Sequence, residues 1–382
     1  MRPLRTAQDS TGRRIRQESV VARFLGQDWT KGGLRAYLSD AAQVAGAFPC
    51  VLSDGKSDGV RSVSVRTGSG LEFSVLPGRA MDIPQAWYRG VPLHFASATG
   101  ITAPAYYEEP ELRWLRTFFG GLLATCGITY SGAPCVDQGE ALGLHGRIGN
   151  AGAENVCISE EWQGDEYCIT LRGRMREATV MGENITLTRT LTTRLGASGF
   201  QLHDLIENRG FEPQPLMMLY HFNFGFPLLS PAARVVAPIE ITTPRDDQAA
   251  RDNGVAECRG FCEPRANYAE KVFFHQLRAD SAERTFVGLV NTDVGGQALG
   301  IVLRYSRAQL PQLTEWKMMG KGCYVVGLEP GTVVPVGRAK ARELGTLPLL
   351  EAQESYAVDI DFEVLDGVDR ITELEAEADT LR

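Results

Sequence analysis

The sequence lacks several patterns that mark common protein classes. Its eight cysteines contain no C-x-x-C pair, which argues against a zinc finger and against the disulfide framework of a small secreted domain. No stretch approaches the roughly 18 apolar residues of a membrane helix. No apolar run follows the N-terminal arginines, as a signal peptide would require. We therefore expect reduced cysteines in a soluble, cytoplasmic protein.

Basic residues are too few for a typical nucleic-acid-binding protein. The chain has 39 Lys and Arg against 47 Asp and Glu, a formal net charge of −8. This balance argues against nucleic acid or an anionic membrane as the main partner. The glycine-rich segment 143–150 is not a G-x-G-x-x-G motif, and no helical pattern follows it, so we do not expect a phosphate-binding loop there.

What the chain does contain is a short helix-like region followed by a long β-like one. Residues 16–25 and 33–48 have apolar side chains at helical spacings, with Asp28 or Thr30 as a cap. We predict an N-terminal helical extension over residues 1–48 and one β-domain over residues 49–382. The extension packs either on that domain or on a second subunit in a homodimer, and the sequence does not decide between them.

The segment 216–226 is the clearest β-strand candidate. Alternation puts His221 and Asn223 on one face, among apolar neighbours, where they can act as a titratable group and its orienting partner. A structural buried histidine is the alternative. The other face is apolar throughout and is expected to face the core; its side chains are Met218, Tyr220, Phe222, Phe224 and Phe226.

A second strand, 323–329, ends in a carboxyl group. Cys323, Val325, Gly327 and Glu329 share one face, so Glu329 ends an otherwise apolar strand. Desolvation there would raise its pKa toward that of a useful general base. A solvated carboxylate at the strand end is the alternative.

Loops between the strands supply further candidates for substrate binding. Arg79 and Asp82 follow a Pro-Gly turn, where an arginine fork can hold sugar hydroxyls or a carboxylate, although a surface ion pair explains them as well. His145 and Arg147 share a face of segment 143–150 if it is extended. Residues 234–268 are expected to form a long loop over the binding groove.

Three residues of two later strands are weaker candidates for a functional site. Trp316 and Lys317 can offer an aromatic platform and a cation, or be a core tryptophan and a solvated lysine. His275 can join His145 and His221 in a metal site, but no short H-x-H spacing supports this, and we predict no metal and no cofactor. Residues 368–381 read as an acidic amphipathic surface helix.

Five motifs together resemble the galactose mutarotase-like, or aldose 1-epimerase-like, superfamily. In chain order they are Pro-Gly-Arg-Ala-Met-Asp-Ile (77–83), Phe-Gly-Gly-Leu-Leu-Ala-Thr-Cys-Gly (119–127), Gly-Leu-His-Gly-Arg-Ile (143–148), Leu-Tyr-His-Phe-Asn-Phe-Gly (219–225) and Gly-Leu-Glu-Pro (327–330). The resemblance covers roughly residues 50–365. Within the superfamily the chain looks most like a bacterial branch of mostly uncharacterised proteins.

The resemblance implies a mainly β fold, a β-supersandwich with a carbohydrate groove on a concave face. It further implies Glu329 as general base and His221 as general acid, with His145, Arg79 and Asn223 binding the substrate. The chain departs from the pattern in having Tyr-His-Phe-Asn for His-Pro-Tyr-Phe-Asn, and Glu-Pro for Glu-Thr-Gln.

The function we predict is that of an aldose 1-epimerase-like isomerase, a mutarotase acting on a monosaccharide or sugar acid. Two alternatives remain open. One is a carbohydrate-binding protein without catalysis, and the other is an acid/base epimerase or lyase acting on an oxidised sugar with or without a metal.

Overall fold

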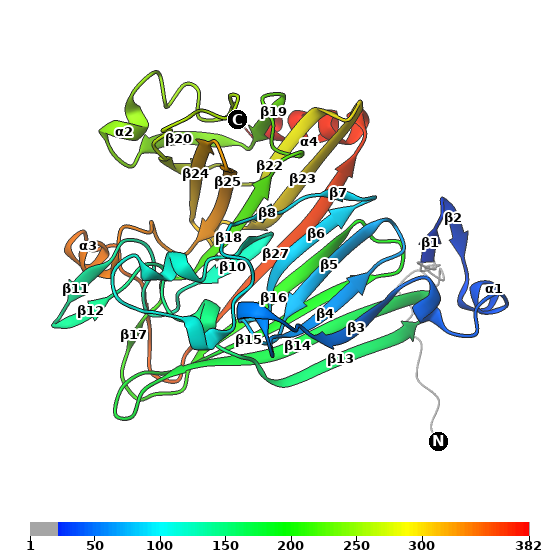
Figure 1. Ribbon diagram of the computed structural model, residues 1–382, viewed down its shortest axis with the longest axis horizontal. Helices are drawn as coiled ribbons and strands as arrows, with labels where there is room; N and C mark the ends of the chain where they lie inside the picture. Colours follow the sequence, from blue (N-terminus) through cyan, green and yellow to red (C-terminus); the bar gives the residue numbers. More distant parts are fainter. Residues whose placement is uncertain (1–21, 382) are drawn as a thin grey trace, which may run out of the picture.

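Two large antiparallel sheets form the body of the protein (Figure 1). The structure, a computed structural model, describes residues 22–381. The first sheet has eleven strands, ten of them in one continuous path with β7 paired to β6 at the side. In sheet order they are β20 (Ile239–Pro244), β21 (Lys271–Leu277), β24 (Gln312–Gly320), β25 (Cys323–Gly331), β18 (Leu219–Gly225), β10 (Leu123–Cys126), β6 (Asp82–Tyr88), β5 (Leu71–Leu76), β4 (Arg61–Arg66) and β3 (Gly46–Val51), with β7 (Val91–Pro92).

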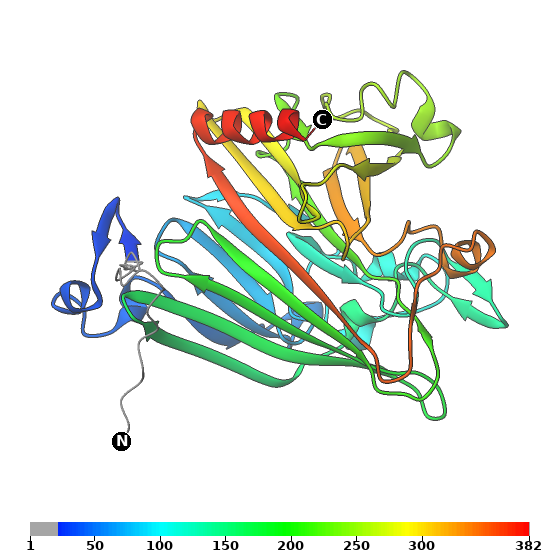
Figure 2. The same cartoon turned by 180° about the vertical axis from the view of Figure 1, so that it is seen from behind.

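The second sheet has eight strands and lies behind the first in the view of Figure 1, so its long strands are nearest the reader in Figure 2. In sheet order they are β13 (Glu154–Gln163), β14 (Glu166–Ala178), β15 (Asn184–Arg194), β16 (Gly199–Asn208), β27 (Ser355–Asp366), β23 (Gln297–Ser306), β22 (Arg284–Val294) and β19 (Ala233–Val236). This arrangement confirms the predicted mainly β sandwich of the galactose mutarotase-like type.

The main core lies between the inner faces of the two sheets. Alternation in β18 sends Tyr220, Phe222 and Phe224 into it, as predicted, and in β25 it sends Val326 and Leu328 the same way. Phe226 does not follow this pattern. It lies just beyond the end of β18 and its side chain is 73% exposed, so the prediction that it faces the core is wrong.

A buried ion-pair network crosses the core. Arg189 on β15 has no exposed surface and donates from Nε and Nη2 to the two oxygens of Asp204, at 2.9 and 2.7 Å. The Tyr220 hydroxyl donates to Asp204 as well, at 2.9 Å. Arg189 Nη1 reaches across to Asp82 in the first sheet, at 3.3 Å. The charge of the guanidinium is thus compensated by two carboxyl groups from different sheets, as a buried charge requires.

Smaller elements surround the sandwich. Four two-stranded pairs join β1 (Ala22–Phe24) with β2 (Gln27–Trp29), β8 (Phe95–Ala96) with β9 (Gly120–Gly121), β11 (Cys135–Asp137) with β12 (Glu140–Leu142), and β17 (Gln214–Pro215) with β26 (Leu349–Leu350). The helices are α1 (Lys31–Arg35), α2 (Asp247–Ala250), α3 (Arg338–Glu343) and α4 (Val368–Thr380), with 3₁₀ turns η1 (Ala41–Gln43), η2 (Gly55–Ser57), η3 (Pro104–Tyr106), η4 (Arg113–Arg116) and η5 (Ile148–Asn150).

Helix α4 covers the outer face of the second sheet, where it crosses the strand ends in Figure 2. Its Ile371, Leu374 and Ala378 are buried against strands β19, β22, β23 and β27, while the other side of the helix is acidic and exposed. The predicted amphipathic surface helix is therefore confirmed, with one apolar stripe that closes a second, smaller core.

The N-terminal region is less helical than its spacing predicts. Residues 22–29 form the β1–β2 hairpin, whose turn residues Leu25 and Gly26 both have positive φ, 51° and 76°, as a tight hairpin turn requires. Thr30 does cap a helix, since its side chain accepts from the Gly33 N–H, but α1 ends at Arg35. Residues 16–21 of the first predicted helix lie outside the described residues.

The predicted helix over residues 33–48 is also interrupted. Two glycines in α1 weaken it, η1 is a single turn, and β3 already begins at Gly46. The division of the chain into 1–48 and 49–382 stays a prediction, and β3 runs across that boundary.

Candidate functional site

His221 and Glu329 meet on the outer face of the first sheet. Strands β18 and β25 are antiparallel neighbours, with Phe222 opposite Leu328 and Asn223 opposite Gly327. This register brings the two functional side chains together, with 3.1 Å between His221 Nε2 and Glu329 Oε1. Both residues are deeply buried, with exposed fractions of 4% and 2%. The pairing that the sequence implied is thus formed by adjacent strands.

Burial opposes charge on both members of this pair. Desolvation, with a smaller contribution from Glu270, raises the pKa of Glu329 well above its ordinary value. Desolvation, with a smaller contribution from the His145 ring, lowers the pKa of His221 well below its ordinary value. Both effects favour a protonated carboxyl beside a neutral imidazole. The pair then holds one acid and one base without net charge.

Two atoms of the pair are left free for a ligand. Among the residues that the structure describes, neither Glu329 Oε1 nor His221 Nδ1 has a hydrogen-bond partner. The contact of Glu329 Oε1 with His221 Nε2 is short but is not aligned as a hydrogen bond. Buried polar atoms of this kind are uncommon and call for a ligand, water or ion to satisfy them.

His145 lies beside the pair on the loop between β12 and η5. Its backbone has a positive φ of 58° and is held by the Gly127 N–H and the Gly132 carbonyl, at 3.0 and 3.1 Å. The ring centroids of His145 and His221 are 5.6 Å apart. The Gly132 N–H donates to His145 Nδ1, at 3.4 Å, so the proton of the neutral ring is on Nε2. Desolvation lowers the pKa of His145 to about 4, and the ring is therefore a neutral donor at physiological pH.

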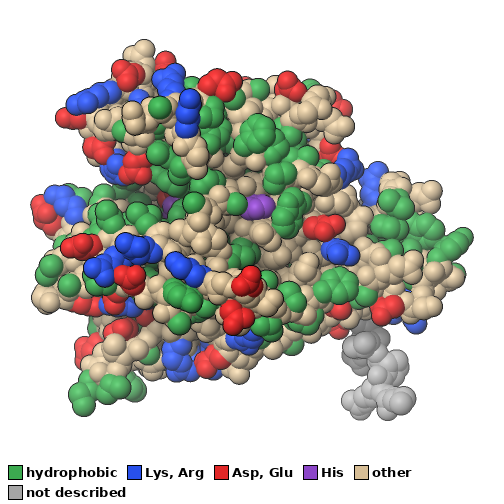
Figure 3. Space-filling model, viewed as in Figure 1, with side chains coloured by type: hydrophobic (Ala, Val, Ile, Leu, Met, Phe, Trp, Pro, Cys, Tyr) green, Lys and Arg blue, Asp and Glu red, His purple; other side chains and the backbone are tan. Residues whose placement is uncertain are grey.

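Aromatic side chains enclose the two histidines. Phe118 and Trp316 lie 5.3 and 5.5 Å from the His221 ring, and Trp114 lies 4.8 Å from the His145 ring. Trp316 Nε1 donates to Glu270 at 2.8 Å, which fixes the indole. Of the two alternatives for Trp316, a place at the site is therefore favoured over a core position. Figure 3 shows histidine surface (purple) in a hollow between apolar side chains, on the face seen there.

The sequence analysis did not identify Trp114 and Phe118 as site residues. Trp114, in η4, and Phe118, just before the Gly120–Gly121 pair, stack on each other with ring centroids 4.7 Å apart. These glycines have positive φ, and a Cβ at Gly120 would lie 2.5 Å from the Phe95 carbonyl oxygen. This glycine pair therefore allows a close approach of two backbone segments. An aromatic pair just before it was the available indication of a site wall.

Arg79 is not directed toward the site. It is 3% exposed, and its guanidinium donates to the carbonyls of Gly149, Thr102 and Thr117, at 2.8, 2.7 and 3.3 Å. Burial lowers its pKa to about 10. Asp82, also buried, accepts from the backbone and hydroxyl of Thr125 and takes part in the core network. Arg79 and Asp82 therefore form neither the surface ion pair nor the sugar-binding site that the sequence suggested.

Arg147 and Asn223 differ in whether their polar groups already have partners. Arg147 forms ion pairs with Glu109 and Glu140 and covers the Tyr130 ring, so its charge is already compensated. The Asn223 amide donates to the His221 and Gly120 carbonyls, at 2.8 and 3.2 Å, and so orients the histidine strand. Its Oδ1 has no partner within residues 22–381. Asn223 is thus the stronger ligand candidate of the two.

Lys317 and His275 lie on the opposite face of the first sheet. Trp316 is opposite Gly327 and shares its face, so its neighbour Lys317 points to the other side. His275, paired with Leu313, lies on that side too and contacts Glu315 at 2.9 Å. The three-histidine metal site is therefore wrong, because strand alternation separates His275 from His145 and His221. The predicted role of Lys317 as a substrate-binding cation is wrong for the same reason. The solvated lysine is wrong as well, because Lys317 is 6% exposed and donates to three backbone carbonyls.

The predicted long loop over residues 234–268 is wrong in part, because β19 and β20 occupy residues 233–236 and 239–244. Lys317 holds residues 257–260 on its own face of the sheet, away from the site. Glu270, next to β21, does contact a residue of the site, Trp316.

None of the helices within residues 22–381 is long and apolar enough to cross a membrane.

Comparisons with known proteins agree with this architecture. Residues 57–364 match the profile of a family described as a domain of unknown function, DUF4432. A candidate aldose 1-epimerase from Klebsiella pneumoniae is 27% identical and superposes with a TM-score of 0.82, covering 87% of this chain and 86% of that one. The search of curated proteins gives no match.

More distant solved structures share the fold. A galactose mutarotase-like protein from Clostridium acetobutylicum is 14% identical, with a TM-score of 0.56 over 85% of this chain and 99% of that one. Galactose 1-epimerase from Lactobacillus acidophilus is 11% identical, with a TM-score of 0.55 over 85% and 100%. With the family match over most of its length, the chain belongs to the DUF4432 family, on a galactose mutarotase-like fold.

Proposed function

We propose that the protein interconverts the anomers of a monosaccharide or sugar acid by acid/base catalysis at Glu329 and His221. The observation that carries this proposal is the 3.1 Å contact between a carboxyl whose pKa is raised and an imidazole whose pKa is lowered. Groups with such opposed shifts are typical of catalytic acid/base pairs. Similarity to a candidate aldose 1-epimerase supports the reaction class.

Mutarotation needs one group to take the proton of the anomeric hydroxyl and another to protonate the ring oxygen. The hemiacetal then opens, the carbonyl carbon rotates, and the ring closes on the other face. One shared proton suffices, because the acid and the base are both restored when the ring closes. Neutral Glu329 and neutral His221 hold this single proton between them.

The initial position of the proton decides which residue acts first. Burial favours the proton on Glu329, which makes the carboxyl the acid and His221 the base. Transfer of that proton between the two residues gives the reverse assignment, which is the one the superfamily resemblance implies. Either form completes the reaction, since each contains one donor and one acceptor.

The remaining residues suit substrate binding. His145 Nε2–H can donate to a sugar oxygen next to the pair, and the rings of Trp316, Trp114 and Phe118 offer apolar surface to the C–H face of a sugar. His145 and Trp316 are partly exposed, whereas His221 and Glu329 are buried. We therefore place the entry side at His145 and Trp316, with the anomeric carbon innermost.

Magnetisation-exchange NMR on equilibrated anomers tests this proposal directly. The panel contains aldoses, deoxy sugars and uronic acids, and the proteins are the wild type, Glu329→Gln, His221→Ala and the control His203→Ala. His203 is an exposed histidine paired with Asp359 on the second sheet. Faster exchange with one sugar, lost in the first two variants and kept in the control, is the expected result.

A different outcome points to the other functions. If the folded protein binds a sugar and does not accelerate its anomer exchange, it is a carbohydrate-binding protein. If it converts an oxidised sugar to a new product, detected as new resonances, the pair acts in epimerisation or elimination and not in mutarotation.

A further inference from the structure

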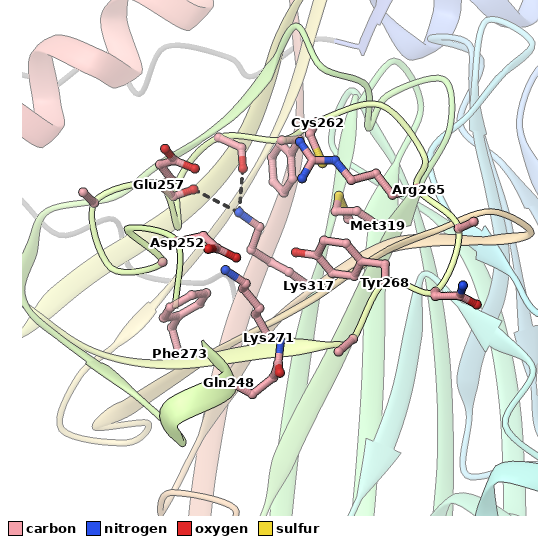
Figure 4. A pocket seen from close by; sticks show the side chains of 17 residues that line it. Gln248, Asp252, Glu257, Cys262, Arg265, Tyr268, Lys271, Phe273, Lys317 and Met319 are labelled. Carbon is pink, nitrogen blue, oxygen red and sulfur yellow. Dashed lines mark hydrogen bonds between the residues drawn. The ribbon is translucent and has the colours of Figure 1, made fainter. Parts of the chain in front are cut away.

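A second group of buried polar side chains lies on the opposite face of the first sheet. There the sheet extends through β24, β21 and β20, and the segment 245–270 folds over it (Figure 4). The segment and the strands enclose a cavity of about 670 Å³, lined among others by Glu257, Phe273 and Lys317. Nothing in the reaction proposed at His221 and Glu329 uses this face.

Cys258, His275 and Glu315 converge beside residues that line this cavity, since the Cys258 carbonyl accepts from Lys317. One potential ligand atom from each, the cysteine sulfur, a ring nitrogen and a carboxyl oxygen, all lie within 4.8 Å of one another. The three residues are buried, with exposed fractions of 2%, 1% and 0%. They come from three separate parts of the chain, the covering segment, β21 and β24, so their convergence is a product of the fold and not of a local motif.

The hydrogen bonds of His275 leave one nitrogen directed at this cluster. Its Nδ1 is 3.0 Å from Thr242 Oγ1 on β20, and its Nε2 is 2.9 Å from Glu315 Oε2. A ring that donates from Nδ1 to a hydroxyl presents a lone pair on Nε2, which is the usual arrangement of a metal-bound histidine and its outer partner. Thr242 is placed to act as that outer partner.

Glu315 is incompletely satisfied. Its Oε2 meets His275, but within the described part of the chain its Oε1 has no hydrogen-bond partner, although the side chain has no exposed surface. A buried carboxyl oxygen without a partner is costly and calls for an ion or a water molecule. This free oxygen is the observation that distinguishes the cluster from an ordinary buried His–Glu contact.

Lys317 holds the covering segment in place beside the cluster. Its Nζ donates to the carbonyl oxygens of Glu257, Cys258 and Gly260, at 3.0, 2.9 and 2.6 Å; two of these bonds are drawn in Figure 4. The chain thus wraps around the ammonium group, which fixes the backbone of Cys258 close to Glu315. The position of the thiol is therefore set by a buried contact and not by a free loop.

We propose that Cys258, His275 and Glu315 bind a zinc ion that fastens segment 245–270 to β21 and β24. Thiolate, imidazole and carboxylate form a ligand set that zinc accepts in tetrahedral geometry, with water in the fourth position. Bonds of 2.0–2.3 Å place such ligands about 3.3–3.8 Å from one another. The ligand atoms now lie within 4.8 Å of one another, so their separations would change by at most about 1.5 Å to reach this geometry.

Metal analysis of the full-length protein tests the proposal. The protein is purified without chelator, its zinc content is measured by mass spectrometry, and the metal-depleted protein is titrated with Zn²⁺ and with Co²⁺ as a spectroscopic probe. We expect one bound metal per chain and a thiolate-to-cobalt charge-transfer band, because Cys258 is a ligand.

Matched variants separate this site from adventitious binding. Cys258→Ser and Glu315→Gln should lose the metal, and Cys258→Ser should also lose the cobalt band. Thr242→Val should bind about 10- to 100-fold more weakly, as expected for loss of an outer partner. Cys262→Ser, a nearby cysteine of the same segment that lines the cavity, should behave as the wild type.

Three results would overturn the proposal. One is a folded wild-type protein, checked by circular dichroism, that binds neither metal. Another is a cobalt band that persists in Cys258→Ser. The third is an equal loss in Cys262→Ser, which would assign the metal to a different ligand set. Because these readouts do not depend on sugar chemistry, the proposal can fail or hold independently of the proposed reaction.

Discussion

Replacing Glu329 by glutamine should reveal the protonation state of the buried pair through protein stability. In the folded chain, burial raises the pKa of Glu329 well above its ordinary value of 4.5. In the unfolded chain the carboxyl loses its proton near that ordinary value. Between these two pKa values the folded state binds one proton more than the unfolded state, so the wild type loses stability as the pH rises.

The size of the effect follows from that one proton. A difference of one bound proton corresponds to a slope of about 1.4 kcal/mol per pH unit. Glutamine has no proton to lose, so the stability of Glu329→Gln relative to the wild type should increase by about this amount per pH unit from about pH 5 upward. The increase should stop where the pH exceeds the raised pKa of Glu329 in the folded chain.

His221 contributes a slope of the opposite sign at lower pH. Its pKa in the folded state lies below the ordinary 6.5, with burial as the main cause, so its contribution to stability is lost as the pH falls below that value. Glutamine resembles the neutral carboxyl, and this contribution is therefore nearly the same in the wild type and in the variant. It cancels in the difference between them.

Urea unfolding, followed by tryptophan fluorescence and circular dichroism at several pH values, measures this difference. Glu351→Gln, which replaces an exposed carboxyl, controls for the substitution itself. A difference between Glu329→Gln and the wild type that does not change with pH, or that decreases as the pH rises, would show that Glu329 is ionised in the folded protein. The argument for a neutral pair would then be refuted.

Three further predictions concern residues that support the fold. Arg189→Met should lower the free energy of unfolding by about 3–5 kcal/mol, because it leaves two buried carboxyl groups without their cation. Arg194→Met, at an exposed ion pair with Glu166, should lower it by less than about 1 kcal/mol. Equal losses of the two variants in urea unfolding would contradict the role of the buried network. Leu374→Ala should lower the free energy of unfolding by about 2–5 kcal/mol, because it opens a cavity under α4. Val368→Ala, on the exposed side of that helix, should change it by about 0.5 kcal/mol or less. A small loss at Leu374 would mean that α4 is not packed as described. Arg79→Met should lower the melting temperature and leave the sugar preference in the NMR panel unchanged; altered preference with unchanged melting would instead support the sugar-binding role expected from the sequence.

Much of the site's framework could be predicted from periodicity. Side chains in a strand alternate between faces whatever the surrounding fold, so the apolar set of β18 and the opposite position of His221 follow from the order of residues alone. The same reasoning placed Glu329 on one face of β25. The structure agrees in both strands, except at Phe226, which lies beyond the end of the strand.

Arg79 and Asp82 show where this reasoning stops. Both follow a Pro-Gly turn, and this suggested from the sequence that they lie on a loop at a strand edge. The groups that enclose them belong to distant residues, the carbonyls of Thr102, Thr117 and Gly149 around Arg79 and the guanidinium of Arg189 beside Asp82. No local pattern contains these neighbours, so burial of the two charges could not be read from their own surroundings.

The sequence by itself determined the two faces of β18 and β25 and the motifs that match the superfamily, because these depend on neighbours within a few residues. Only the tertiary structure decided which strands lie side by side, and therefore which functional groups meet. The register of β18 with β25 brings His221 to Glu329, while the order β21–β24–β25 sends His275 to Glu315 on the other face. Strand order depends on contacts between distant segments, and those contacts cannot be predicted from the local pattern of a single sequence.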